Sequence, residues 1–240
     1  MKLTTDALTK RYGEFELSIP DLDIQSGTVV GLVGNNGAGK TTFLRLVLDL
    51  IRADEGAVRL DGDAVADTVD WKERTGSYLG PSFLIDFLTP DEYWHFVGQT
   101  YDLDEATIEE RLAAFDEFYV DEPIGETTKY IRDLSTGNQN KAGLIAALLP
   151  EPDLLVFDEP FASLDPKSQI QLKELLQERR GDATMLISSH DLDHVTDVSD
   201  RIAILEDGAV VRDESTDPDT LEDLTTYFAE TIRPRENVAA

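Results

Sequence analysis

GNNGAGKTT, residues 34–42, is the stretch of sequence that decides how this chain folds. It contains Gly34, four further residues and then Gly39-Lys40-Thr41, which is the spacing of a loop that binds phosphate groups. The apolar run Val29–Val33 predicts a buried strand before the loop, and helical spacing of apolar residues predicts a helix over Phe43–Leu50 after it. This context suits the motif, because glycines let backbone N–H groups turn toward a phosphate at a helix start. A nucleotide-binding loop is therefore favoured over a glycine-rich turn.

Two side chains of the loop are expected to carry chemistry. The Lys40 ammonium would neutralise the β- and γ-phosphates of a nucleotide, and the Thr41 hydroxyl would hold Mg²⁺. A second motif, LLVFDEP at residues 154–160, is an apolar strand that ends in acids. Such a strand places a carboxylate at the carboxyl edge of the sheet, beside the phosphate loop. Asp158 is therefore expected to bind Mg²⁺, and Glu159 to act as general base toward a water molecule.

The composition bounds the class of protein. With 240 residues the chain can bury a full core, and one α/β domain with a smaller lobe is favoured over two independent domains. No apolar run approaches the roughly 20 residues of a membrane span, and the first residues lack the apolar centre of a signal peptide. The absence of cysteine excludes disulfides and thiol chemistry. These features predict a cytoplasmic protein.

The charge of the chain is strongly negative. Forty-nine acidic residues face 21 basic ones, for a formal net charge of −28, and the acids are dispersed along the sequence. They indicate either an ordinary solvated acidic surface or a halophilic adaptation to a cytoplasm of high salt. The breadth of the bias favours the second interpretation. The charge also argues against nucleic-acid partners, because binding to a phosphate backbone needs a basic surface.

The pattern of apolar residues changes along the chain. Residues 2–33 are rich in short strand-like runs, whereas residues 86–149 read as a helical lobe. Thr89, followed by proline and then by glutamate at the third position, predicts a capped helix start. Further helices are predicted over Glu105–Tyr119 and Lys141–Leu149. The stripe expected to be buried on the first of these consists of Ile108, Leu112, Phe115 and Phe118.

In the last third of the chain, apolar runs typical of strands alternate with segments that have the apolar spacing of helices. Asp165-Pro166 predicts a helix start, Met185–Ile187 a buried strand, and Asp207-Gly208 the turn of a hairpin. Strands that alternate with helices indicate a mainly parallel sheet.

Five motifs occur in an order that identifies a family: GNNGAGKTT (34–42), LSTGNQ (134–139), LLVFDEP (154–160), SLD (163–165) and SSH (188–190). Together they resemble the ATP-binding subunit of ABC transporters, over about residues 3 to 225. The resemblance implies an α/β fold of the P-loop NTPase class. It has a mainly parallel sheet core, an N-terminal antiparallel β subdomain and an inserted helical lobe at about 86–149. The ABC-type ATP-binding domain would span 1–228, with a C-terminal tail at 229–240.

The resemblance also assigns roles to single residues. Tyr12 would stack on the adenine, while Ser135 and Gly137 would face an ATP held by a second copy of the chain. The implied ATP contacts are Tyr12, Gly34, Asn35, Asn36, Gly37, Ala38, Gly39, Lys40, Thr41, Thr42, Ser135, Gly137 and Asp165. The implied catalytic residues are Glu159, His190 and Lys40, and the implied Mg²⁺ ligands are Thr41 and Asp158.

Two segments depart from the family pattern. Thr136 replaces a glycine of the signature segment, and Asn138 stands where glutamine is usual. The family also has a glutamine near residues 76–80, which contacts Mg²⁺ and reports to the membrane partner. Residues 76–82 contain neither glutamine nor glutamate, and Gly80, Pro81 or Ser82 occupies its place.

The resemblance implies one main function, and two other functions remain as alternatives to it. We expect an ATPase subunit that works as a homodimer and drives export by a separate membrane permease, from the inner face of the cell membrane. The alternatives are an ABC-type ATPase acting on a macromolecule, and an ATP sensor without hydrolysis. The aromatic residues Tyr93, Trp94 and Phe96 would border the groove for a permease helix or, as we favour, belong to the core.

The charge generates a first prediction. At about 1 M salt the Debye length falls to about 3 Å, so repulsion among the acidic residues is screened. The melting temperature of the purified chain should therefore rise with KCl up to molar concentration, as followed by circular dichroism. A melting temperature that stays flat or falls with KCl would contradict the high-salt interpretation.

Overall fold

The structure, a computed structural model, describes residues 1–216, 224 and 226. Its strands are β1 (Leu3–Tyr12), β2 (Phe15–Ile19), β3 (Asp23–Ile24), β4 (Val29–Val33), β5 (Glu55–Leu60), β6 (Asp63–Ala64), β7 (Thr75–Tyr78), β8 (Leu154–Asp158), β9 (Thr184–Ser189), β10 (Arg201–Glu206) and β11 (Ala209–Ser215). Its α-helices are α1 (Lys40–Val47), α2 (Pro90–Thr100), α3 (Glu105–Leu112), α4 (Thr136–Leu148), α5 (Pro166–Glu178) and α6 (Leu192–Thr196). The predicted tail 229–240 lies outside the described residues.

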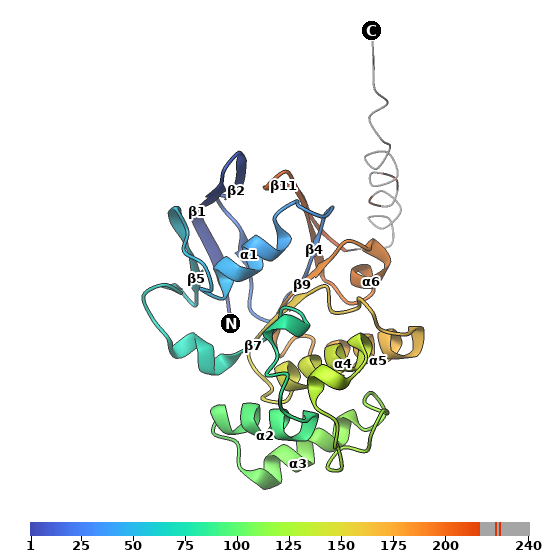
Figure 1. Ribbon diagram of the computed structural model, residues 1–240. Coiled ribbons are helices and arrows are strands. Elements are labelled where there is room, and N and C mark those ends of the chain that lie inside the picture. Colours follow the sequence, from blue (N-terminus) through green and yellow to red (C-terminus); the bar gives the residue numbers. More distant parts are fainter. Residues whose placement is uncertain (217–223, 225, 227–240) are drawn as a thin grey trace.

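These strands form one sheet with two parts. Its order over the described residues is β6-β5-β1-β2-β11-β10-β4-β9-β8-β7, with β3 paired to β1. From β10 to β7 the neighbours run parallel, whereas β1 is antiparallel to β2, β3 and β5. Figure 1 shows the antiparallel strands β1, β2 and β5 at one end of the molecule and helices α2 and α3 at the other. The predicted fold class, with its parallel core and antiparallel N-terminal strands, is confirmed.

The parallel strands are buried on both faces by helices. Every residue of β4 and β9 is buried, as are the first four of β8. Alternate side chains point to opposite faces, so that Val156 packs beneath α1 while its neighbour Phe157 joins the cluster of α4 and α5. No helix in the described part of the chain is long and apolar enough to cross a membrane.

The helices α2, α3 and α4 pack on one another around Trp94. Its side chain is 0% exposed, its indole N–H donates to Ala142 O at 2.9 Å, and its ring meets that of Tyr119 edge-on. Phe96 on the same helix is 48% exposed. The aromatic residues predicted on this helix therefore divide between the core and the surface.

Three of the predicted helices had wrong limits. The first helix begins at Lys40 and ends at Val47, and α4 already begins at Thr136, because polar first turns are invisible to an apolar pattern. The helix predicted through Tyr119 ends at Leu112 and tightens into a 3-10 turn. This change of twist lets the sequence neighbours Phe118 and Tyr119 both reach the core, which a continuous α-helix would separate by about 100°.

The start of α2 generates a second prediction. As predicted, Thr89 caps this helix: its hydroxyl accepts from Glu92 N–H at 3.3 Å, and Glu92 accepts from Thr89 N–H at 2.8 Å. Thr89→Ala should lower the free energy of unfolding by about 1 kcal/mol, because the Glu92 N–H group at the helix start loses its hydrogen-bond acceptor.

Thr89→Ser, which keeps the hydroxyl, is the matched control and should stay close to wild type in chemical denaturation. Equal losses in the two variants would show that the methyl group matters rather than the cap.

Candidate functional site

The phosphate loop joins β4 to α1 and turns sharply at its glycines. Gly37 and Gly39 have φ values of 86° and 109°, which other residues adopt only with strain. A Cβ on Gly34 would lie 2.2 Å from Leu205 O of β10, so only glycine permits this close approach. The helix then begins at Lys40, which leaves its first backbone N–H groups at the mouth of the loop.

A cavity of about 420 Å³ opens over this loop, a size within the range of small-molecule sites. It is lined by Tyr12, Phe15, Asn35, Asn36, Gly37, Gly39, Lys40, Thr41, Thr42, Asp158 and Glu159. Tyr12 is 51% exposed, so its ring is open to a planar ligand. Phe15 was not among the predicted residues, although its place beside Tyr12 in the turn between β1 and β2 was a signal for it.

Lys40 is the basic residue in the lining of the cavity, and its ammonium group has oxygen partners within the chain. Its side chain is buried, and Nζ donates to Gly34 O at 2.6 Å. Nζ also lies 3.4 Å from Glu159 Oε1. A charge held at the loop in this way can be shared with an anion that arrives there.

Asp158 connects the loop to two strands of the sheet. Thr41 Oγ1 donates to one carboxylate oxygen at 2.6 Å, and Ser188 Oγ of β9 donates to the other at 2.5 Å. The Ser188 hydroxyl in turn accepts from Glu159 N–H at 2.9 Å. Ser188 lies in the SSH motif, which was the available signal, but it was not among the predicted site residues.

Glu159 and His190 form a pair at the edge of the cavity. His190 Nδ1 lies 2.8 Å from Glu159 Oε2, and the His190 backbone N–H donates to the same oxygen at 3.3 Å. Glu159 has a φ of 51°, an uncommon conformation for this residue type. The carboxylate therefore stands between two nitrogen groups, Lys40 Nζ and the His190 ring.

The donors at Thr41 and Asp158 suit Mg²⁺. Both present hard oxygen atoms, and the two oxygens lie 2.6 Å apart at the mouth of the phosphate loop. No group of three or more acidic or histidine side chains that could hold a metal is found among the described residues. Mg²⁺ commonly takes one or two protein oxygens and completes its shell with phosphates and water, so this small donor set fits it.

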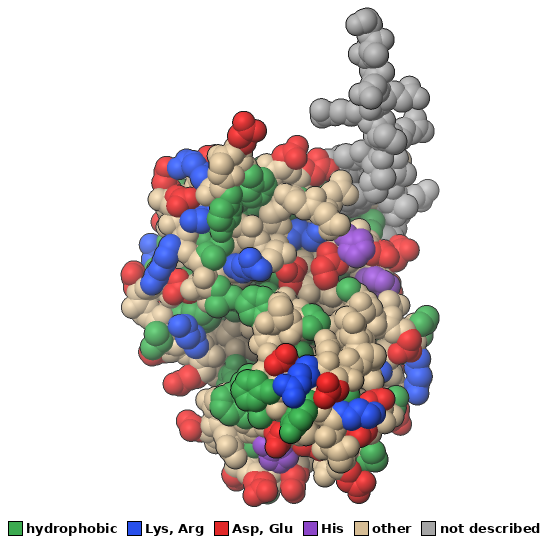
Figure 2. Space-filling model, in the orientation of Figure 1, with side chains coloured by type: hydrophobic (Ala, Val, Ile, Leu, Met, Phe, Trp, Pro, Cys, Tyr) green, Lys and Arg blue, Asp and Glu red, His purple; other side chains and the backbone are tan. Residues whose placement is uncertain are grey.

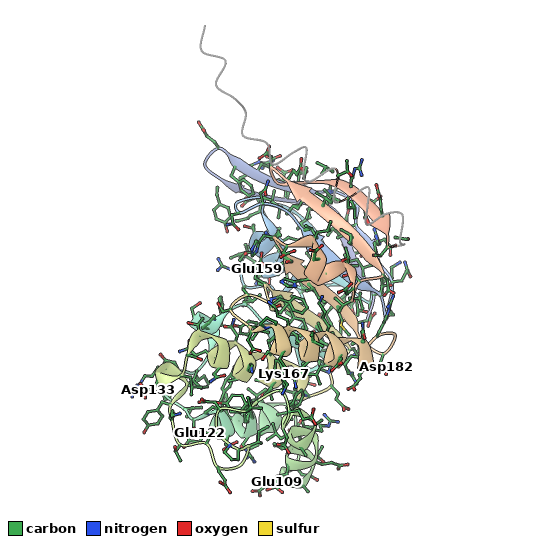
Figure 3. The ribbon with its side chains drawn as sticks, turned by 90° about the vertical axis from the view of Figure 1, so that its right-hand side faces the viewer. Glu109, Glu122, Asp133, Glu159, Lys167 and Asp182 are labelled. Carbon is green, nitrogen blue, oxygen red and sulfur yellow. The ribbon has the colours of Figure 1, made fainter. Side chains whose placement is uncertain are left out.

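Three predicted nucleotide contacts lie elsewhere in the chain. Ser135 caps α4, and its hydroxyl accepts from Asn138 N–H at 3.3 Å. Asp165 caps α5 and accepts from the Lys167 and Ser168 N–H groups. Neither residue nor Gly137 lines the cavity. Figure 3 shows Asp133, just before Ser135, well apart from Glu159.

Comparisons with known proteins identify the family. The family model described as "ABC transporter" matches residues 17–162. The chain belongs to the ABC transporter family. It is an ATP-binding subunit, and ATP hydrolysis by such subunits energises transport.

Individual relatives agree with this identification. The ABC subunit is 32% identical over 198 residues to "ABC transporter ATP-binding protein NatA" of Bacillus subtilis, covering 79% of this chain and 78% of that one. It is 30% identical over 223 residues to "Daunorubicin resistance ATP-binding protein DrrA3" of Streptomyces coeruleorubidus, covering 90% and 68%.

Solved structures share the fold. A structure titled "Structure of ATP binding subunit of ABC transporter" superposes with a TM-score of 0.80 at 28% identity, covering 95% of this chain and 94% of the other. The dimeric cassette MJ0796, at 23% identity, has the same fold with a TM-score of 0.77 over 90% and 99% of the two chains.

Proposed function

We propose that this ABC subunit binds ATP with Mg²⁺ in the phosphate-loop cavity and hydrolyses it with Glu159 as general base. One observation carries the proposal. Lys40 and Thr41 of the loop, together with Asp158 and Glu159 of a segment more than a hundred residues away, line a single cavity. A site that only sensed ATP would not need a second carboxylate held beside the first by a histidine.

The contacts of Glu159 suggest how hydrolysis proceeds. When phosphates occupy the loop, their oxygens take over Lys40, and its ion pair with Glu159 is released. Glu159, oriented by His190, then accepts a proton from a water molecule. The water oxygen forms a bond to the γ-phosphorus while the bond to the ADP oxygen breaks, which yields ADP and inorganic phosphate. When bound, Mg²⁺ held by Thr41 and Asp158 would offset phosphate charge.

Ser135, Gly137 and Asp165 act in a homodimer under this proposal. They lie outside the cavity of their own chain, so a second copy in head-to-tail orientation is needed to bring them to the ATP. In support, the cassette MJ0796, which shares the fold, is described as dimeric. The Ser135 end of α4 would then present backbone N–H groups to the γ-phosphate.

The permease partner is proposed to bind a second hollow. This groove of about 420 Å³ is separate from the phosphate loop. Its lining includes Trp71, Tyr78, Phe83, Leu84, Tyr93 and Tyr101. Its aromatic lining suits the apolar face of a permease helix, which would hold the subunit on the inner face of the membrane. Export is the proposed direction, supported by the likeness to a daunorubicin resistance protein.

The proposed base generates a third prediction. Glu159→Gln should lower kcat for ATP hydrolysis by about 10²–10⁴-fold, because an amide cannot accept the proton. The variant should also form a dimer that persists in ATP, as measured by light scattering after size exclusion.

Glu174→Gln, an exposed change of the same kind on α5, is the matched control and should hydrolyse ATP at the wild-type rate. If Glu159→Gln hydrolyses ATP at the wild-type rate, Glu159 is not the general base.

The proposed metal site generates a fourth prediction. Asp158→Asn should raise the Mg²⁺ concentration for half-maximal ATPase activity by about tenfold or more, because a charged ligand becomes neutral. Asp153→Asn, at the other end of β8 and paired with Arg74 on the surface, is the control and should leave it unchanged. An unchanged Mg²⁺ requirement in Asp158→Asn would place the ion elsewhere.

A further inference from the structure

Tyr78 ends strand β7 and faces two regions of the molecule. Its side chain lines the groove proposed for the permease, yet the residue is only 3% exposed. A Cβ on Gly143 of α4 would lie 2.6 Å from the ring, so the ring is packed directly on the helix backbone. A movement of the groove wall at Tyr78 is therefore passed on to α4.

The Tyr78 hydroxyl begins a chain of two buried hydrogen bonds. It donates to Asn140 Oδ1 of α4 at 2.5 Å, and Asn140 Nδ2 donates to the backbone carbonyl of Ala162 at 2.6 Å. The direction of both bonds is determined, because a carbonyl only accepts and the amide nitrogen must face it. Asn140 is 4% exposed, so loss of either bond leaves a buried polar group without its partner.

Ala162 belongs to the short loop that carries Glu159. The Ala162 N–H donates to Glu159 O at 3.1 Å, which closes a turn that starts at the proposed base. The loop is strained at both ends, with φ values of 51° at Glu159 and 61° at Ser163. Such a loop keeps its conformation only if its surroundings hold it, and Asn140 is a side chain that does so from another element.

We propose that Asn140 is a positioning residue for ATP hydrolysis, and that Tyr78 connects it to the groove. The relay Tyr78–Asn140–Ala162 sets the backbone turn that aims Glu159, so a partner seated in the groove acts on hydrolysis through these bonds. It leaves nucleotide binding in the phosphate-loop cavity of the same chain unchanged, because no member of the relay lines that cavity. The inference rests on the proposed role of Glu159 as base.

Two variants of the full chain test the relay. Tyr78→Phe removes the hydroxyl and keeps the ring, and Asn140→Leu replaces the amide with an apolar group of similar size. Each should lower kcat by about tenfold, the scale expected for one lost buried hydrogen bond, while KM and the Kd for a non-hydrolysable ATP analogue change less than about twofold. The double variant should be no slower than the slower single one, since both act through one chain of bonds.

The groove offers a matched control. Tyr101 lines the same groove, but its hydroxyl donates to the Thr75 carbonyl at 2.6 Å, whereas the Tyr78 hydroxyl donates to Asn140 of α4. Tyr101→Phe should therefore keep the wild-type kcat. Equal losses in Tyr101→Phe and Tyr78→Phe would overturn the relay, as would additive losses in the double variant.

Glu159→Gln separates this inference from the proposed function. If Glu159→Gln is inactive while Tyr78→Phe and Asn140→Leu are folded and as fast as wild type, the relay is wrong and the base stands. If Glu159→Gln is as fast as wild type, the base assignment fails, and the relay that aims it fails with it. Melting temperatures of all variants identify any loss of kcat that comes from unfolding.

Discussion

The parallel register of β4, β9 and β8 is the constraint on which the whole site depends. Val33 pairs with Ser189, and Ser188 pairs with Asp158, so the three strands end together at one edge of the sheet. The phosphate loop, His190 and Glu159 follow these ends directly. A slip of one residue between β8 and β9 would turn Asp158 to the other face, away from Thr41 and Ser188. The complete burial of these strands makes such a slip costly.

Electrostatics set a second constraint. Acidic side chains are spread over the face shown in Figure 2 rather than gathered in one patch, and the chain as a whole carries a formal charge of −28. The described cavity lining has Lys40 as its basic residue and two acids, Asp158 and Glu159. A bare ATP anion meets repulsion from these carboxylates, and a divalent cation bound to the ATP lowers that repulsion because it offsets part of the negative charge. The oxygen donors of Thr41 and Asp158 would hold Mg²⁺ at the place where the negative charge of the protein repels the phosphates of ATP.

Helix α4 joins the parts of the molecule that the site needs. Its start carries Ser135, its first half holds Asn140 against the Glu159 loop, and its middle accepts the Trp94 indole through Ala142. The helix is buried over much of its length, and Gly143 allows Tyr78 to pack against its backbone. A rigid and desolvated helix in this position links the lobe of α2 and α3 to the loop that follows β8.

Much of this protein was determined by local sequence. Glycine spacing predicted the phosphate loop, apolar runs predicted β4, β8 and β9, and Thr89 and Asp165 predicted their helix caps, because each depends on neighbouring residues alone. Local pattern could not place Ser188 between Asp158 and Glu159, show that Phe15 lines the cavity, or exclude Ser135 from the cavity of its own chain. It also could not reveal that Tyr78, Asn140 and Ala162 meet. Those relations join residues far apart in sequence, and only packing of the sheet against α4 brings them within hydrogen-bonding distance.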